Sequence, residues 1–176
     1  MHIMLDLETL SSSSNAAIIA IGAVRFDMTN MQIELDNTFY RTISPKSAQQ
    51  SGGEIDGNSV LWWFMQPEEA RAEFIGDSNA SIESALNDFS KWVRETPCEG
   101  IWAHGSYFDN VVLSNAYLRL KRTPPWDFFE LNRCYSTVAY MHPEIPFVKE
   151  GIEHHALHDA ISQAKHLCEI LKNKGD

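Results

Sequence analysis

The sequence has few cysteines, no long apolar run and no excess of basic residues. Its three cysteines are far apart and form no CxxC pair, which argues against a disulfide framework or a cysteine zinc site and fits a reducing compartment. The longest apolar run, residues 16–24, contains a glycine and is much shorter than the ~20 residues that cross a bilayer. Asp6 and Glu8 lie where a signal peptide would be basic and then apolar. We therefore expect a cytoplasmic protein without a membrane-spanning segment.

The charge balance limits the possible partners. The net charge is −10, from 24 acidic and 14 basic residues, whereas proteins that track nucleic-acid phosphates by charge are usually basic. The charge still allows a protein that binds one end of a nucleic-acid chain through divalent cations, because these ions supply the missing positive charge. The alternative is an acidic enzyme with no nucleic-acid partner. The sequence has no GxGxxG and no GxxxxGK[ST] pattern, which excludes nucleotide sites of these two kinds.

The length of 176 residues predicts a single domain over residues 1–176. Apolar and β-branched segments predict strands at 2–7, 16–27, 34–43 and 100–104. Amphipathic segments predict helices that begin near Asn58 or Ser59, at Pro67 and after Ser81, and further helices over 109–121, 131–141 and 156–172. Hairpins followed by strand–helix alternation and a closing helix predict a mixed α/β sheet covered by helices.

Asp6 and Glu8 lie two residues apart in an otherwise apolar predicted strand. The period of two places both side chains on one face, where charged groups are costly unless they are paired, bound to metal or exposed. Two hard oxygen ligands on one face suit magnesium or manganese. The spacing alone is weak evidence, because two acidic residues separated by one position occur three times in the chain.

Two further acids and a cluster of histidines lie near predicted helix starts. Asp109 and Asp159 each fall in the first turn of a predicted helix. The helix dipole favours acids there, so this position alone explains them without a catalytic role. His154, His155 and His158 lie at the start of the last helix. They allow three interpretations: a zinc site on one helix face, a structurally idle cluster, or a general base, since the pKa of histidine lies near the working pH.

Three motifs follow one another along the whole chain: LDLET at 5–9, HGSYFD at 104–109 and HHALHDA at 154–160. Together they resemble the motifs of the DnaQ-like 3′–5′ exonuclease superfamily in its DEDDh branch. The third matches the family pattern His-x-Ala-Leu-x-Asp-Ala throughout, whereas the second departs at Gly105 and Ser106, where the family often has Asn and Ala. Residues 59–63 resemble a smaller branch of stand-alone exoribonucleases of bacteria and phages.

This resemblance implies a ribonuclease-H-like fold and a metal-dependent 3′–5′ exonuclease that releases nucleoside 5′-monophosphates. The implied ligands of two divalent metal ions, Mg or Mn, are Asp6, Glu8, Asp109 and Asp159. The implied substrate is the 3′ end of single-stranded RNA or of an overhang, with single-stranded DNA as the alternative substrate. The alternative that is not an enzyme is a nucleic-acid-binding module with the same fold and no catalytic activity. Members of the family are often homodimers, so a homodimer is expected.

The implied general base is His154, five residues before Asp159, with His155 as the second candidate. Five residues turn an ideal helix by about 500°, so His154 and Asp159 cannot share a helix face. We therefore expect His154 in the loop before the last helix, from which it would fold back over the metal ions.

The substrate-binding residues that we expect are Thr9, Leu10, His104, Trp62, Arg119 and Arg122. Trp62 or Trp63 offers a stacking face for a base, but adjacent helix residues point about 100° apart, so we expect only one of them to stack. The two arginines are candidates for phosphate contacts. Alternatively, the two arginines only stabilise the end of the predicted helix, since cations are favoured near a helix C-terminus.

Overall fold

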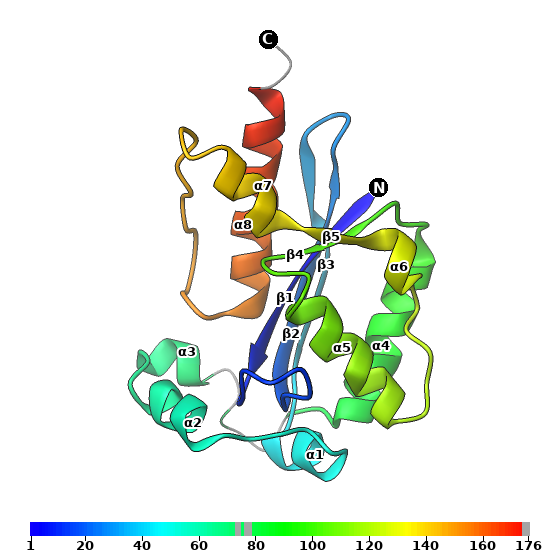
Figure 1. Cartoon of the computed structure of the whole chain (residues 1–176), viewed down its shortest axis with the longest axis vertical. Coiled ribbons are helices and arrows are strands. Elements are labelled where there is room, and N and C mark those ends of the chain that lie inside the picture. The colour runs from blue at the N-terminus through cyan, green and yellow to red at the C-terminus, as the bar shows by residue number, and fades with distance from the viewer. Residues whose placement is uncertain (73–74, 76–78, 174–176) are drawn as a thin grey trace.

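The computed structural model describes residues 1–72, 75 and 79–173. A five-stranded sheet lies at its centre (Figure 1), in the strand order β3-β2-β1-β4-β5. The strands are β1 (His2–Thr9), β2 (Ile18–Asp27), β3 (Gln32–Thr42), β4 (Ile101–Ala103) and β5 (Asn132–Cys134). The first three strands pair antiparallel, whereas β4 is parallel to β1 and β5 is parallel to β4. This arrangement confirms the predicted mixed α/β sheet.

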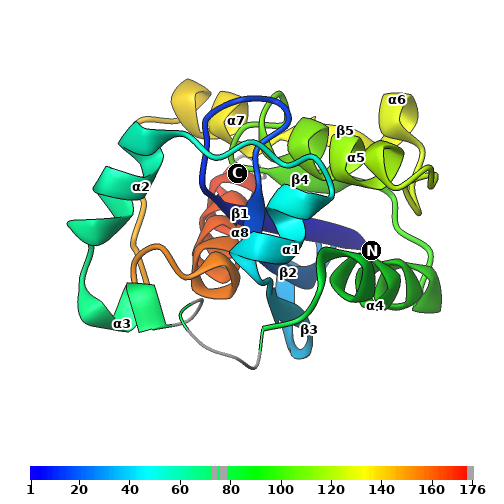
Figure 2. The ribbon, with the colours of Figure 1, turned by 90° about the horizontal axis from the view of Figure 1, so that it is seen from below.

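Helices cover both faces of the sheet. They are α1 (Pro45–Gln50), α2 (Gly57–Phe64), α3 (Glu68–Ala72), α4 (Ile82–Glu95), α5 (Asp109–Arg119), α6 (Phe128–Leu131), α7 (Tyr135–Met141) and α8 (Ala156–Lys172). The long helix α8 packs against β1 and β2. Helices α2 and α3 lie on the side of α8, away from α4 (Figure 2). None of the helices in the described part of the chain has the length and apolar character needed to cross a membrane.

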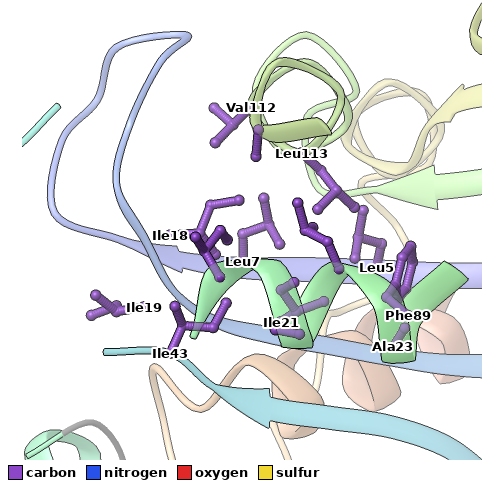
Figure 3. Packing of buried hydrophobic residues seen from close by; sticks show 14 of the residues in the cluster. Leu5, Leu7, Ile18, Ile19, Ile21, Ala23, Ile43, Phe89, Val112 and Leu113 are labelled. Atoms are coloured by element: carbon purple, nitrogen blue, oxygen red, sulfur yellow. The ribbon is translucent and has the colours of Figure 1, made fainter. Parts of the chain in front are cut away.

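Alternate residues of β1 face two separate hydrophobic cores. Leu5 and Leu7 pack with residues of α4 and α5 (Figure 3). Met4 faces the opposite side and packs with residues of α8. Because side chains alternate along a strand, Asp6 and Glu8 lie on the same face as Met4. The apolar pattern of β1 therefore directs both carboxylates towards α8.

Residues 131–141 do not form the single helix that the sequence predicts. Helix α6 ends at Leu131, the next three residues form β5 beside β4, and α7 begins only at Tyr135. The side chain of Asn132 explains the break, because its Oδ1 accepts hydrogen bonds from Asn110 Nδ2 at 2.9 Å and from Trp126 Nε1 at 3.0 Å. These two bonds and the pairing with β4 outweigh the local helical preference.

The N-terminal cap of α4 is the residue that the sequence predicts, whereas the cap of α2 is a different residue. Ser81 caps α4, as predicted, and its side chain accepts a hydrogen bond from Ser84 N. Helix α2 is capped by Asp56 rather than by Asn58 or Ser59, because Asp56 Oδ1 accepts hydrogen bonds from the backbone N–H groups of both. The short helix α1, which the sequence analysis missed, begins with a proline after a serine cap, a common helix start.

Gly22 allows the start of α8 to approach the sheet closely. It pairs with Asp6 across β1 and β2. A Cβ atom on Gly22 would lie 2.2 Å from the backbone carbon of Ala156 and 2.2 Å from the backbone nitrogen of Leu157. Only glycine therefore permits this contact, which brings the first turn of α8 and its Asp159 against β1.

We expect Gly22→Ala to destabilise the protein, because the added methyl group must displace the start of α8. Overpacking of this kind costs about 1–3 kcal/mol and should also reduce the nuclease activity that the resemblance implies, since it moves Asp159 away from β1. Thermal unfolding and an activity assay measure both effects. Gly57→Ala is the matched control, because a Cβ atom there meets nothing within 4 Å. Equal behaviour of the two variants would contradict this role of Gly22.

Candidate active site

Three carboxylates meet at the seam between β1 and α8. Asp6 and Glu8 come from β1, and Asp159 comes from the first turn of α8. One oxygen from each of the three groups lies within 4.8 Å of the others, and all three residues are half-buried. We call these three residues the acidic cluster.

A fourth acid, Asp109, comes from a different helix. It is the first residue of α5, which follows the C-terminal end of β4 after a short turn. Its side chain is buried, and its Oδ2 accepts a hydrogen bond from Gly105 N at 3.4 Å. Among the neighbouring acids, Asp109 has the largest effect on the pKa of Asp6. The structure thus brings Asp109 within electrostatic reach of the acidic cluster.

Burial and the charges of neighbouring acids raise the pKa values of Asp6 and Glu8, and burial raises the pKa of Asp109. Burial is the main cause for Asp6, whose pKa lies well above its usual range, and the charges of Asp109 and Glu8 raise it further. The pKa of Glu8 rises to about 8, first through burial and then through Asp159 and Asp109. Burial raises the pKa of Asp109 to about 6. Several acids that oppose ionisation together form a site that a bound cation stabilises.

The acidic cluster fits a hard divalent metal ion. Carboxylate oxygens are the ligands that Mg²⁺ and Mn²⁺ prefer in proteins, and three of them converge here. One further polar group supports the cluster, since Gln163 Nε2 donates a hydrogen bond of 2.8 Å to Asp6 Oδ1. The other amide atom of this side chain, Oε1, is buried and has no hydrogen-bond partner in the described structure.

The two candidate bases take different positions. His154 lies in the turn before α8, with a left-handed backbone (φ 59°), a conformation that is uncommon outside glycine. Its ring packs edge-on against Trp62, with 4.7 Å between ring centroids. His155 instead caps α8, is buried, and stacks on Tyr40 and His158. His155 therefore has a structural role at the start of α8, and the role of His154 as the base stays a prediction.

A cleft of about 450 Å³ opens beside Glu8. Its lining residues include Thr9, Trp62 and Trp63, together with serines of the loop after β1. Trp62 is exposed, whereas Trp63 is buried and its Nε1 donates a hydrogen bond to Thr9 O at 2.8 Å. The expectation that only one of the two tryptophans offers a free face agrees with this arrangement. Leu10, which the sequence analysis predicts to bind substrate, is buried in the main hydrophobic core. Its contact with substrate stays a prediction.

A second cleft, of about 530 Å³, opens on the side of Asp159. His104, Gln163 and Phe147 are among its lining residues. His104 is exposed at the end of β4. The acidic cluster therefore lies between two clefts, one lined by Glu8 and one lined by Asp159, and His104 borders the second.

The two predicted phosphate-binding arginines lie elsewhere. Arg119 Nη1 donates to Asn15 Oδ1 at 3.4 Å. Arg122 forms an ion pair with Glu83 at 2.7 Å and lines a different cavity, beside α4. Neither arginine lines the two clefts that border the acidic cluster, so their role in substrate binding stays a prediction.

Two residues at the acidic cluster escaped the sequence analysis. Gln163 lies four residues after Asp159 on α8, a spacing that places both on one helix face, so the sequence carries a signal for it. Lys149 forms an ion pair with Asp159, between Nζ and Oδ1. It comes from the segment between α7 and α8, and no local pattern in that segment points to the contact.

The sequence matches the family model of the Rv2179c-like 3′–5′ exoribonuclease domain over residues 1–171. The chain belongs to this family. It is therefore a 3′–5′ exonuclease, and the resemblance noted from its three motifs is confirmed. No curated protein matches the sequence of this exonuclease.

Solved structures show the same fold. The nuclease domain of 3′hExo, a DEDDh family member bound to rAMP, is 14% identical, with a TM-score of 0.64; the match covers 97% of this chain and 91% of that one. Exonuclease X in complex with 5′ overhanging duplex DNA is 18% identical, with a TM-score of 0.62; the match covers 100% of this chain and 94% of that one. These similarities confirm the predicted ribonuclease-H-like fold.

In the presence of a chelator, we expect the stability of this exonuclease to fall as the pH rises from about 5 to 8. In the folded protein Glu8 keeps its proton up to a pKa of about 8, whereas in the unfolded chain it loses the proton near about 4.3. The folded state binds more protons between these values, so the free energy of unfolding decreases with rising pH. Manganese should offset this loss by binding the ionised acids. Thermal unfolding with EDTA or Mn²⁺ measures both effects.

The matched variants are Glu8→Gln and Glu169→Gln, which replaces an exposed acid on α8. With EDTA, the melting temperature of Glu8→Gln should depend less on pH than that of the wild type, and Glu169→Gln should follow the wild type. Identical pH profiles for all three proteins would show that Glu8 does not carry the raised pKa.

Proposed function

We propose that this chain is a metal-dependent exonuclease that removes nucleotides one at a time from the 3′ end of single-stranded RNA. The observation that carries the proposal is the acidic cluster, in which three carboxylates lie within 4.8 Å of one another next to a cleft with an exposed tryptophan. Such a cluster suits divalent ions, and the match to an exoribonuclease family supports RNA as the substrate.

Asp6, Glu8 and Asp159 would hold the metal ions, with Asp109 as a further ligand. A bound divalent ion supplies a Lewis acid that activates water and offsets negative charge on the phosphate. The charges of Asp109 and Glu8 both act on Asp6, so the Asp6 carboxylate would gain most from the positive charge of a bound ion. Gln163 would hold the Asp6 carboxylate in place through its hydrogen bond.

His154 would accept the proton that the attacking water loses. The water oxygen forms the new bond to the terminal phosphorus, the bond from phosphorus to the 3′ oxygen of the preceding nucleotide breaks, and that oxygen gains a proton. The released product is a nucleoside 5′-monophosphate. The position of His154 outside α8, against Trp62 at the cleft, supports this role.

The cleft beside Glu8 would seat the 3′-terminal nucleotide. Trp62 offers an exposed aromatic face on which a base of any sequence can stack. Polar side chains line the same cleft, among them Ser12, Asn58 and Ser59. Hydroxyl and amide groups of this kind can bind the sugar hydroxyls, and a 2′-hydroxyl contact distinguishes RNA from DNA.

A denaturing-gel time course with 5′-labelled RNA and DNA of matched sequence tests the proposal. We expect a ladder of shortened RNA with Mn²⁺ or Mg²⁺, slower shortening of DNA, and no cleavage with EDTA. Asp159→Asn should reduce the rate by about a hundredfold or more, since it removes a metal ligand, whereas Glu169→Gln should cleave like the wild type. Intact RNA in every lane, or equal cleavage with EDTA, would contradict the proposed function.

The same assay separates the two candidate bases. His154→Ala should reduce the rate by about a hundredfold or more and leave the melting temperature nearly unchanged. His155→Ala should lower the melting temperature, because it removes the cap of α8 and the stack with Tyr40. Normal cleavage by His154→Ala would exclude His154 as the base.

A further inference from the structure

Among the residues that the structure describes, the lysine that pairs with the acidic cluster is Lys149. Its Nζ pairs with Asp159 Oδ1, and its side chain is half-buried. Its charge also acts on Glu8, the neighbouring acid of the cluster. The ammonium group therefore lies at the oxygen atoms that a divalent ion would use.

The backbone beside Lys149 is fixed to α8. Glu150 N donates a hydrogen bond of 3.0 Å to Ser162 Oγ, and the Glu150 carboxylate pairs with Lys165. Ser162 and Lys165 lie on the helix that carries Asp159. The segment between α7 and α8 is thus attached immediately next to Lys149, and the position of its ammonium group follows from this attachment.

The clefts around the acidic cluster contain little positive charge. Within the described ranges, neither the cleft beside Glu8 nor the cleft beside Asp159 is lined by a lysine or an arginine. The arginines that the sequence suggested for phosphate binding bind other elements. A phosphodiester bound at the acidic cluster would therefore lie beside Lys149, the cation that pairs with Asp159. Lysine ammonium groups bind phosphates as compact point charges.

We propose that Lys149 is a phosphate-binding residue of the active site, which pairs with Asp159 until a divalent ion takes that carboxylate and then pairs with the phosphate of the substrate or product. This inference rests on the proposed function, because it requires a phosphate at the acidic cluster. It makes two predictions of opposite sign. Loss of the ammonium group should strengthen metal binding, since a competitor for Asp159 disappears, and it should weaken phosphate binding.

Isothermal titration calorimetry tests both predictions on the full chain. Mn²⁺ is titrated first, and adenosine 5′-monophosphate is then titrated at saturating Mn²⁺, for wild type, Lys149→Met and Lys149→Arg. Lys149→Met should bind Mn²⁺ at least about threefold more tightly and the nucleotide about tenfold more weakly. Lys149→Arg keeps the charge and should retain most of the nucleotide affinity.

Lys172→Met is the matched control, because this exposed lysine lies thirteen residues beyond Asp159 on the same helix, about 20 Å away along its axis. It should match the wild type in both titrations. Unchanged affinity of Lys149→Met for Mn²⁺ or for the nucleotide would overturn the inference. If the wild type cleaves RNA while Lys149→Met binds both ligands normally, only the role of Lys149 fails. If the wild type neither cleaves RNA nor binds the nucleotide, the proposed function fails as well.

Discussion

The partial burial of the carboxylates of Asp6, Glu8 and Asp159, together with the repulsion between them, is the constraint on which the site depends. Three acids whose oxygens lie within 4.8 Å would weaken the fold if all of them were ionised without a cation. The hydrogen bond from Gln163 and the ion pair with Lys149 offset part of this cost. A bound divalent ion would offset the rest of this cost, which is why we propose this cluster as the active site.

The fold produces this arrangement through packing on both faces of β1. Leu5 and Leu7 fix one face against α4 and α5, which leaves the other face to carry the acids. Gly22 then lets α8 approach β2 so closely that Asp159 meets them. The parallel strand β4 ends beside β1 and leads into α5, which brings Asp109 within electrostatic reach of Asp6 and Glu8. Strand order and one missing side chain thus bring three acids together and place a fourth within electrostatic reach of them.

Much of this architecture could be predicted from the sequence, because it rests on local patterns. The apolar alternation in β1 predicts that Asp6 and Glu8 share a face, and motif order predicts the four acids. The strand β5 could not be found, since three half-buried residues carry no alternation and are fixed by bonds to Asn132. Lys149 could not be found either, because its contact depends on how the segment between α7 and α8 folds against the helix.

Proton release on metal binding is the most direct test of the account. The raised pKa values mean that the acidic cluster holds protons near neutral pH, and a divalent ion must displace them. Calorimetric titration of Mn²⁺ at pH 7, in buffers of different ionisation enthalpy, counts the protons released. The account predicts a net release of protons that is reduced in Glu8→Gln. Tight manganese binding without any proton release would contradict the claim that the burial of these carboxylates and the repulsion between them shape this site.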